Sequence, residues 1–83
     1  MKGSEFKAIR EKLGLTQDEL AEVLCLSGKQ VISNIETEFR NASKLSEVLM
    51  RIFIHLPEKH SLELRRLLKS FSEDFDRAAK RKK

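Results

Sequence analysis

Two short amphipathic helical patterns with a tight polar break between them occupy residues 16–36, and they constrain the fold more than any other stretch. In the first pattern, Leu20 and Ala21 lie on one face while acidic side chains occupy the other. In the second, Ile32 and Ile35 form an apolar edge with polar side chains around it. Alanine on a buried face lets another helix cross at short range. The pattern therefore predicts two short helices packed closely together.

The starts of these helices carry capping signals. Thr16 is predicted to cap the first helix, and Glu19 three positions later completes a capping box. Ser27 is predicted to cap the second helix, which we expect over residues 28–36. Two short helices joined in this way form a helix-turn-helix, and its second helix can lie in the major groove of DNA.

Further helices are predicted on both sides of this motif. Residues 4–12 are expected to form a helix that is capped by Ser4 and stopped by Gly14 in the left-handed conformation. After the motif, a helix capped by Asn41 is expected to end just before Pro57. The apolar stripe of that helix, one edge of which we expect to stay exposed, consists of Leu45, Val48, Leu49, Ile52, Phe53 and Leu56.

A long final helix is expected over residues 58–77, where Ser70 and Ser72 could interrupt it. Its apolar seam can either fold back on the domain or pair with a second copy of the chain. We favour pairing, because helix-turn-helix proteins usually bind DNA as dimers. The seam residues predicted to form the dimer contact are Leu64, Leu68, Phe71 and Phe75.

Length and composition exclude several classes of protein. We expect one domain over residues 1–79, with its core in residues 4–56, which leaves no room for a large enclosed catalytic site. A single cysteine cannot form an intramolecular disulfide, and the spacing of His55 and His60 does not suggest a metal site. No apolar run has membrane-spanning length. We therefore expect a non-enzymatic cytoplasmic protein without cofactor, metal or small-molecule ligand.

The net charge of +4 is a property of the C-terminal end. Without residues 80–83, which are all basic, 13 basic residues balance 13 acidic ones. The high pI is therefore no evidence for a basic surface that faces DNA, and a case for DNA binding has to rest on the helix-turn-helix geometry. We expect residues 80–83 to be a disordered basic tail, which serves either solubility or non-specific DNA contact.

The segments LGLTQDELAEVL and LSGKQVISNIE resemble the XRE/Cro-like helix-turn-helix family of prokaryotic and phage regulators. The resemblance covers roughly residues 6–53 and implies an all-α, five-helix lambda-repressor-like DNA-binding domain. It also suggests that Arg10 pairs with Glu36, although a solvated Arg10 is the alternative. The family motifs match at Thr16, Gln17, Leu20 and Ala21, and again at Ile32, Ser33, Ile35 and Glu36.

The sequence departs from the family pattern in its turns. One extra residue lies between Leu26 and Ile32, and it rotates the first turn of the second helix by about 100°. Cys25 and Glu38 occupy positions where the family usually has glycine. Each of these residues must either adopt a positive φ or sit in a loop of another shape. Phe39, in the loop that follows, is expected to tuck under it.

The predicted DNA contacts fall into two groups. Asparagine and glutamine pair bidentately with adenine, lysine pairs with guanine, and serine contacts several bases. The residues expected to read bases are Lys29, Gln30, Ser33 and Asn34. Phosphate contacts are expected at the helix starts and, by the resemblance, at two downstream basic positions. These residues are Thr16, Gln17, Ser27, Gly28, Arg40 and Lys44.

The sequence thus favours a regulator of transcription that binds double-stranded DNA as a homodimer, and a repressor is the preferred form. A Cro-like switch, an antitoxin autorepressor and a controller of restriction-modification genes remain open as alternatives. The rival hypothesis is a protein-interaction module of antitoxin type, in which the last two helices bind a partner such as a toxin. The balanced charge outside the tail supports this rival.

Overall fold

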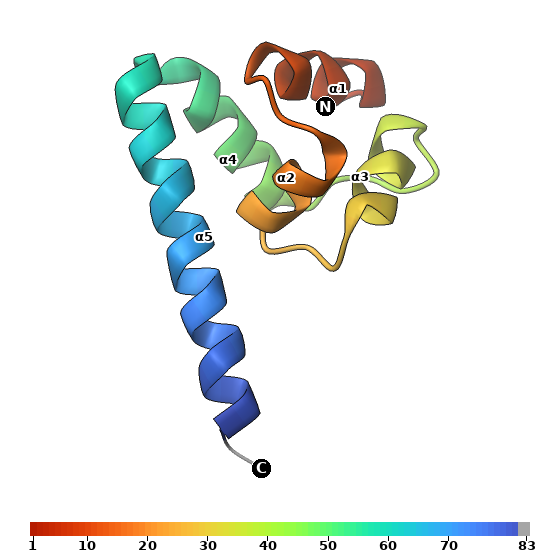
Figure 1. The fold of residues 1–83 in the computed structure, drawn as a ribbon. Helices are drawn as coiled ribbons and strands as arrows, with labels where there is room; N and C mark the ends of the chain where they lie inside the picture. The colour runs from red at the N-terminus through yellow and green to blue at the C-terminus, as the bar shows by residue number, and fades with distance from the viewer. Residues whose placement is uncertain (82–83) are drawn as a thin grey trace.

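The computed structural model describes residues 1–81, with side chains described for residues 1–78. The described residues form five helices and no strand (Figure 1). The helices are α1 (Gly3–Lys12), α2 (Gln17–Val23), α3 (Lys29–Glu36), α4 (Lys44–His55) and α5 (Glu58–Arg81). The all-α architecture predicted from the sequence is confirmed, with the helix-turn-helix at α2 and α3.

The core lies where the first four helices meet. Ala21 is 2% exposed, and its carbonyl oxygen accepts a hydrogen bond from the backbone N–H of Leu26 at 2.8 Å. This small residue lets the chain return at short range between α2 and α3, as the sequence predicts. The buried apolar side chains of the core are Phe6, Ile9, Leu20, Ala21, Val23, Leu24, Ile32, Ile35, Met50 and Phe53.

Two of the predicted helix ends are confirmed. Gly14 has a φ of 73° and donates to the carbonyl oxygen of Glu11, while Leu15 donates to that of Arg10. This pair of bonds satisfies carbonyl groups at the end of α1 that would otherwise lack partners. At the start of α2, Thr16 and Glu19 form the reciprocal capping box.

Three of the predicted caps are wrong. Helix α1 begins at Gly3 rather than after Ser4, because Gly3 packs tightly against the end of α3 and anchors the first turn there. Helix α3 is capped by Gly28 in an extended conformation, not by Ser27, since the extra residue lengthens the turn. The residue that caps α4 is Ser43 rather than Asn41.

The inward face of α4 differs from the predicted stripe. Ser46, Met50 and Phe53 are buried, whereas Leu45 is 68% exposed and other members of the stripe are also at the surface. The three buried side chains are spaced i, i+4 and i+7, so the buried face is rotated about the helix axis from the predicted stripe. The expectation that one edge would stay exposed is confirmed, although the exposed edge is larger than the sequence suggested.

Helix α5 is longer than predicted and unbroken. Neither Ser70 nor Ser72 interrupts it, because each serine fits an otherwise continuous helical pattern without removing a backbone hydrogen bond. Its 24 residues span about 36 Å, so its C-terminal half projects past the other helices (Figure 1). The helix includes Lys80 and Arg81 of the predicted disordered tail, and Lys82 and Lys83 lie outside the described residues.

Candidate nucleic-acid interface

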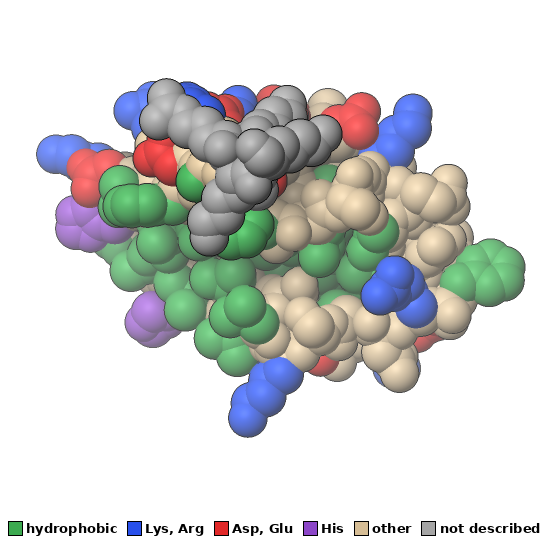
Figure 2. Space-filling model, turned by 90° about the horizontal axis from the view of Figure 1, so that it is seen from below, with side chains coloured by type: hydrophobic (Ala, Val, Ile, Leu, Met, Phe, Trp, Pro, Cys, Tyr) green, Lys and Arg blue, Asp and Glu red, His purple; other side chains and the backbone are tan. Residues whose placement is uncertain are grey.

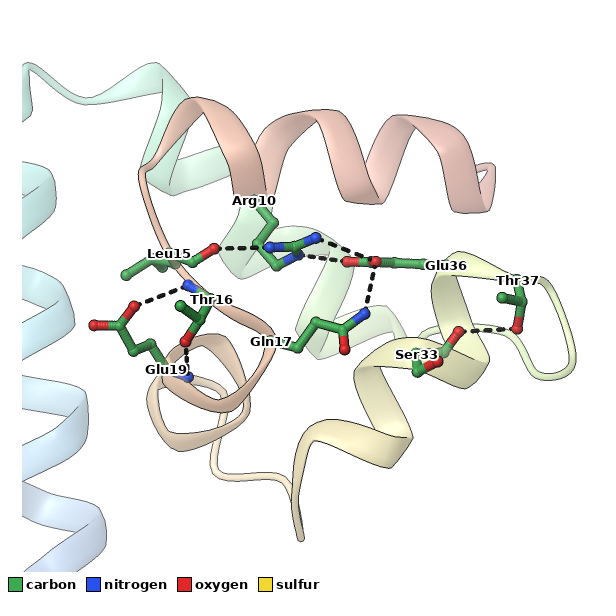
Figure 3. A network of polar contacts seen from close by, with 8 residues as sticks. All are labelled: Arg10, Leu15, Thr16, Gln17, Glu19, Ser33, Glu36 and Thr37. Atoms are coloured by element: carbon green, nitrogen blue, oxygen red, sulfur yellow. Dashed lines mark hydrogen bonds and ion pairs between the residues drawn. The ribbon is translucent and has the colours of Figure 1, made fainter.

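Arg10 and Glu36 lie at the centre of a polar network that joins three helices (Figure 3). The Nε atom of Arg10, on α1, donates to Oε2 of Glu36, on α3, at 2.6 Å. Arg10 also donates through Nη1 to the carbonyl oxygen of Leu15 at 2.9 Å. Because the Glu36 side chain is only 6% exposed, its charge depends on such donors. The structure thus brings together the pair that the resemblance suggested, and the pair holds the end of α3 against α1.

Gln17 is the third member of this network. It is the first residue of α2, and its Nε2 atom donates to Oε1 of Glu36 at 3.0 Å (Figure 3). The contact ties the start of α2 to the end of α3 and fixes the crossing of the two helices. A primary amide carries two N–H groups, so this contact leaves one N–H for another acceptor. The sequence placed Gln17 at this helix end but gave no sign of its bond to Glu36.

The capping box at the start of α2 affects a titratable group. The Thr16 backbone N–H donates to Oε1 of Glu19 at 2.8 Å, and the Thr16 hydroxyl oxygen accepts from the Glu19 backbone N–H at 3.1 Å. Hydrogen bonding to the Glu19 carboxyl from the backbone and then the side chain of Thr16 holds its pKa below the ordinary value. The charged form of Glu19 is therefore the form that completes the cap.

The outward face of α3 carries four adjacent polar side chains. Lys29 and Gln30 are exposed, whereas Ser33 and Asn34 are half-buried at the surface. The amide groups of two of them are joined, because Nε2 of Gln30 donates to Oδ1 of Asn34 at 3.0 Å. All four predicted base-reading residues therefore share one side of the helix. Helix α5, which could have covered this side, lies at the opposite side of the molecule (Figure 1).

The turns on both sides of α3 are held by left-handed residues. Cys25 has a φ of 59° and Glu38 a φ of 66°, so both adopt the positive φ that the departures from glycine suggested. A side chain in this region carries a modest steric cost, which the surrounding packing must offset. The two residues allow α3 to leave and re-enter the domain within short loops.

A family model described as helix-turn-helix matches residues 6–49, which is more than half of the chain. The chain belongs to the XRE/Cro-like helix-turn-helix DNA-binding family. This helix-turn-helix protein is therefore a DNA-binding regulator in general terms, and its family is not an enzyme family. The matched span contains most of α1, all of α2 and α3 and part of α4, and it ends before α5. No curated protein and no solved structure matches the chain significantly.

The predicted phosphate contacts of the helix-turn-helix protein differ in their accessibility. Ser27, Arg40 and Lys44 are exposed, and Gly28 is half-buried at the start of α3. Thr16 is exposed but already engaged in the capping box. The view from below shows uncharged polar side chains and backbone on the α3 side of the molecule, with only a few acidic side chains among them (Figure 2). This surface presents little negative charge to a phosphate backbone.

Phe39 does not tuck under its loop. Its side chain is 85% exposed, so the prediction that it would be covered is wrong. The loop closes on itself instead, since the backbone N–H of Arg40 donates to the carbonyl oxygen of Asn34 at 3.3 Å. With Glu38 in the left-handed region, the ring projects outward beside the end of α3.

Residues 1–81 contain neither a metal-binding cluster nor a membrane-spanning helix. No group of His, Cys, Asp and Glu side chains in this part of the chain is arranged to hold a metal ion. No helix there is long and apolar enough to cross a membrane.

Proposed function

We propose that this helix-turn-helix protein regulates transcription as a sequence-specific, dimeric repressor that inserts α3 into the major groove. The observation that carries the proposal is the exposed polar face of α3, held by the network of Arg10, Gln17 and Glu36. A reading helix has to keep a fixed angle to its domain, since base contacts depend on side-chain position within a fraction of an ångström.

Base reading is assigned to the joined amides of Gln30 and Asn34. The Gln30 amide donates to Oδ1 of Asn34, and this bond uses one of the two lone pairs of that oxygen. The second lone pair and the N–H groups of Asn34 are then oriented to meet N6 and N7 of an adenine. Lys29 and Ser33 extend the same surface along α3.

Phosphate contacts position the domain on the duplex. The free N–H of Gln17 and the N-terminus of α2 suit one phosphate, because an anion is favoured where backbone N–H groups point outward. Arg40 and Lys44, both exposed, are suited to phosphates beyond the end of α3. Thr16, Ser27 and Gly28, which lie at helix starts, are also proposed to contact the phosphate backbone of the DNA.

The proposed dimer surface includes residues of both α5 and α4, whereas the sequence alone suggested only the last helix. Leu64 and Leu68 are half-buried and pack against the core of their own domain, whereas Phe71 and Phe75 are 69% and 73% exposed. The view from below shows apolar side chains gathered on the α4 and α5 side of the molecule (Figure 2). The exposed apolar residues of the two helices include Leu45, Val48, Ile52, Leu67, Phe71 and Phe75.

An exposed apolar surface of this kind usually marks an interaction site. A second copy is the proposed occupant, because charges beside the apolar residues are complementary. Glu73 and Asp74 lie next to the phenylalanines of α5, while Arg51 and Lys44 lie on exposed positions of α4. An antiparallel pairing of α5 with α4 of the other copy brings opposite charges together.

The same surface favours one alternative function, a protein-interaction module that binds a partner such as a toxin. Selection of bound duplexes from a random pool separates the two functions. A dimeric regulator is expected to enrich one sequence with inverted symmetry, with half-sites about one helical turn apart. If no sequence is enriched and binding disappears in moderate salt, the interaction module is the better account.

A further inference from the structure

A small cavity lies where α1 ends and α4 turns into α5, at the end of the molecule away from the C-terminus (Figure 1). It has a volume of about 260 Å³. Its apolar walls come from Leu13, Phe53, Ile54 and Leu56. Its polar lining consists of Ser61 and Arg65, with Lys12 and Glu58 at exposed positions of its rim.

Arg65 is buried in this lining without an anionic partner. It is 7% exposed, and no ion pair among the described side chains includes it. Its hydrogen bonds go to carbonyl oxygens, from Nε to Ser61 at 3.3 Å and from Nη1 to Leu13 at 3.4 Å. Both are longer than an ordinary N–H···O bond, and they use two of the five guanidinium N–H groups. Its Nη2 group makes no hydrogen bond to the described residues and is not sealed from solvent, so it is available to a ligand.

Ser61 gives a second and independent sign of a missing partner. Its side chain is among the most deeply buried of the described residues, at 1% exposure, yet its Oγ atom has no hydrogen-bond partner among them. Buried hydroxyl groups are nearly always hydrogen-bonded in native proteins. The lining of this cavity thus holds a cationic side chain without an anionic partner and a hydroxyl group without a hydrogen-bond partner.

We infer that this cavity binds a small organic carboxylate with an apolar body. The planar fork of Arg65 matches the two oxygens of a carboxylate, and the hydroxyl of Ser61 can donate to the same group. The walls formed by Leu13, Phe53 and Leu56 suit a hydrocarbon portion, which inorganic phosphate lacks. This site goes beyond the sequence analysis, which predicted no small-molecule ligand, and it does not depend on DNA binding.

The inference is tested by titrating the full chain with sodium benzoate and monitoring the amide signals by two-dimensional NMR. Benzoate is expected to shift amide signals around Leu13, Phe53 and Ser61 in a saturable way. Benzamide, which has the same ring without the charge, and sodium chloride at equal ionic strength are not expected to do so.

Matched variants locate the response. Arg65→Lys is expected to lose affinity for benzoate about tenfold, because it replaces a charge-assisted fork with a single ammonium group. Arg66→Lys, an equal change at the exposed neighbouring position, is expected to leave affinity unchanged. Ser61→Ala should fold at least as well as the original chain, since it removes an unpaired hydroxyl, and should bind benzoate several-fold more weakly.

Each remaining outcome contradicts the inference. If benzoate produces no saturable shift, or shifts scattered over surface lysines, the cavity holds water only. Equal responses to benzamide would show that charge is not recognised. If Arg65→Lys fails to fold, Ser61→Ala decides, and unchanged benzoate affinity in that variant overturns the assignment.

Discussion

At the scale of single residues, Gly3 shows how closely α1 approaches the end of α3. A Cβ atom on Gly3 would lie 2.7 Å from the carbonyl oxygen of Ile35 and 2.8 Å from Cγ of Glu38. The backbone oxygen of Ile35 cannot move without shifting α3. Gly3 is therefore required by space rather than by an unusual φ.

Replacement of Gly3 by alanine is expected to destabilise the protein by about 1–3 kcal/mol, because the added methyl group overpacks this contact. Urea unfolding monitored by circular dichroism measures the change. Ser4→Ala is the matched control, since Ser4 is exposed and does not cap α1, and its effect is expected to stay within about 0.5 kcal/mol. Equal effects of the two substitutions would contradict the packing argument.

Arg10 is the second residue with an outsized expected effect. Replacing it with methionine leaves the buried carboxylate of Glu36 with only the Gln17 amide as a donor. The loss is expected to be about 3–5 kcal/mol in the free energy of unfolding. The double variant Arg10→Met, Glu36→Met should recover much of this loss, because it leaves no unpaired buried charge. A double variant no more stable than Arg10→Met alone would refute this explanation.

At the scale of helices, the capping residues separate local from tertiary control. Thr16→Ala and Ser43→Ala each remove a hydrogen bond to the first turn of a helix, and each is expected to cost about 1 kcal/mol. Ser27→Ala and Asn41→Ala, at the caps predicted from the sequence but not used, are expected to be nearly neutral. Thermal unfolding of the four variants gives the comparison, and a reversed ranking would contradict the observed helix starts.

The cap of α2 also predicts a dependence on pH. The pKa of Glu19 is lowered in the folded protein, so its stabilising contribution is present above the unfolded pKa and disappears as pH falls through the folded pKa. Glu19→Gln is therefore expected to reduce stability near neutral pH more than at a pH well below the lowered folded pKa, where the original carboxyl is itself protonated. A difference in stability that does not change with pH would argue against this role.

The number of helices, their order and several of their ends could be predicted from the sequence because they depend on local signals. Gly14 and the pair of Thr16 and Glu19 are examples, since their partners lie within a few positions. The inward face of α4 could not be predicted in the same way, because packing against the other helices decides which side of α4 is buried. The exposure of Phe39 and the burial of Arg65 likewise depend on contacts with distant parts of the chain.

The candidate site also combines features that local sequence indicates with features that depend on contacts between side chains. The four polar positions of α3 could be assigned to one face from helical spacing and family resemblance. The bond from Gln17 to Glu36 and the bond between Gln30 and Asn34 could not, because each amide has several possible partners. These bonds hold side chains of the proposed interface in place, so the sequence indicated candidate residues but not how they are held.

At the scale of the whole molecule, the compact helical body is proposed to contact DNA, whereas the projecting end of α5 is proposed to contact a second copy of the chain. Phe71→Glu is expected to convert dimers to monomers, because it places a charge within the apolar surface of α4 and α5. Sedimentation at working concentration measures the change. Ser70→Glu, on an exposed neighbouring position, should leave the dimer intact. An original protein that is monomeric at these concentrations would remove the dimer from the account.

The proposed function requires that α3, fixed by the network of Arg10, Gln17 and Glu36, reads base edges through Asn34. The most direct test measures the affinity of the original chain and of Asn34→Ala for the selected duplex and for every single-base variant of it. The substitution is expected to cost about 1–3 kcal/mol on the selected duplex and to abolish discrimination at one base position, with the others unchanged. A uniform loss across all positions, or no loss, would contradict the claim.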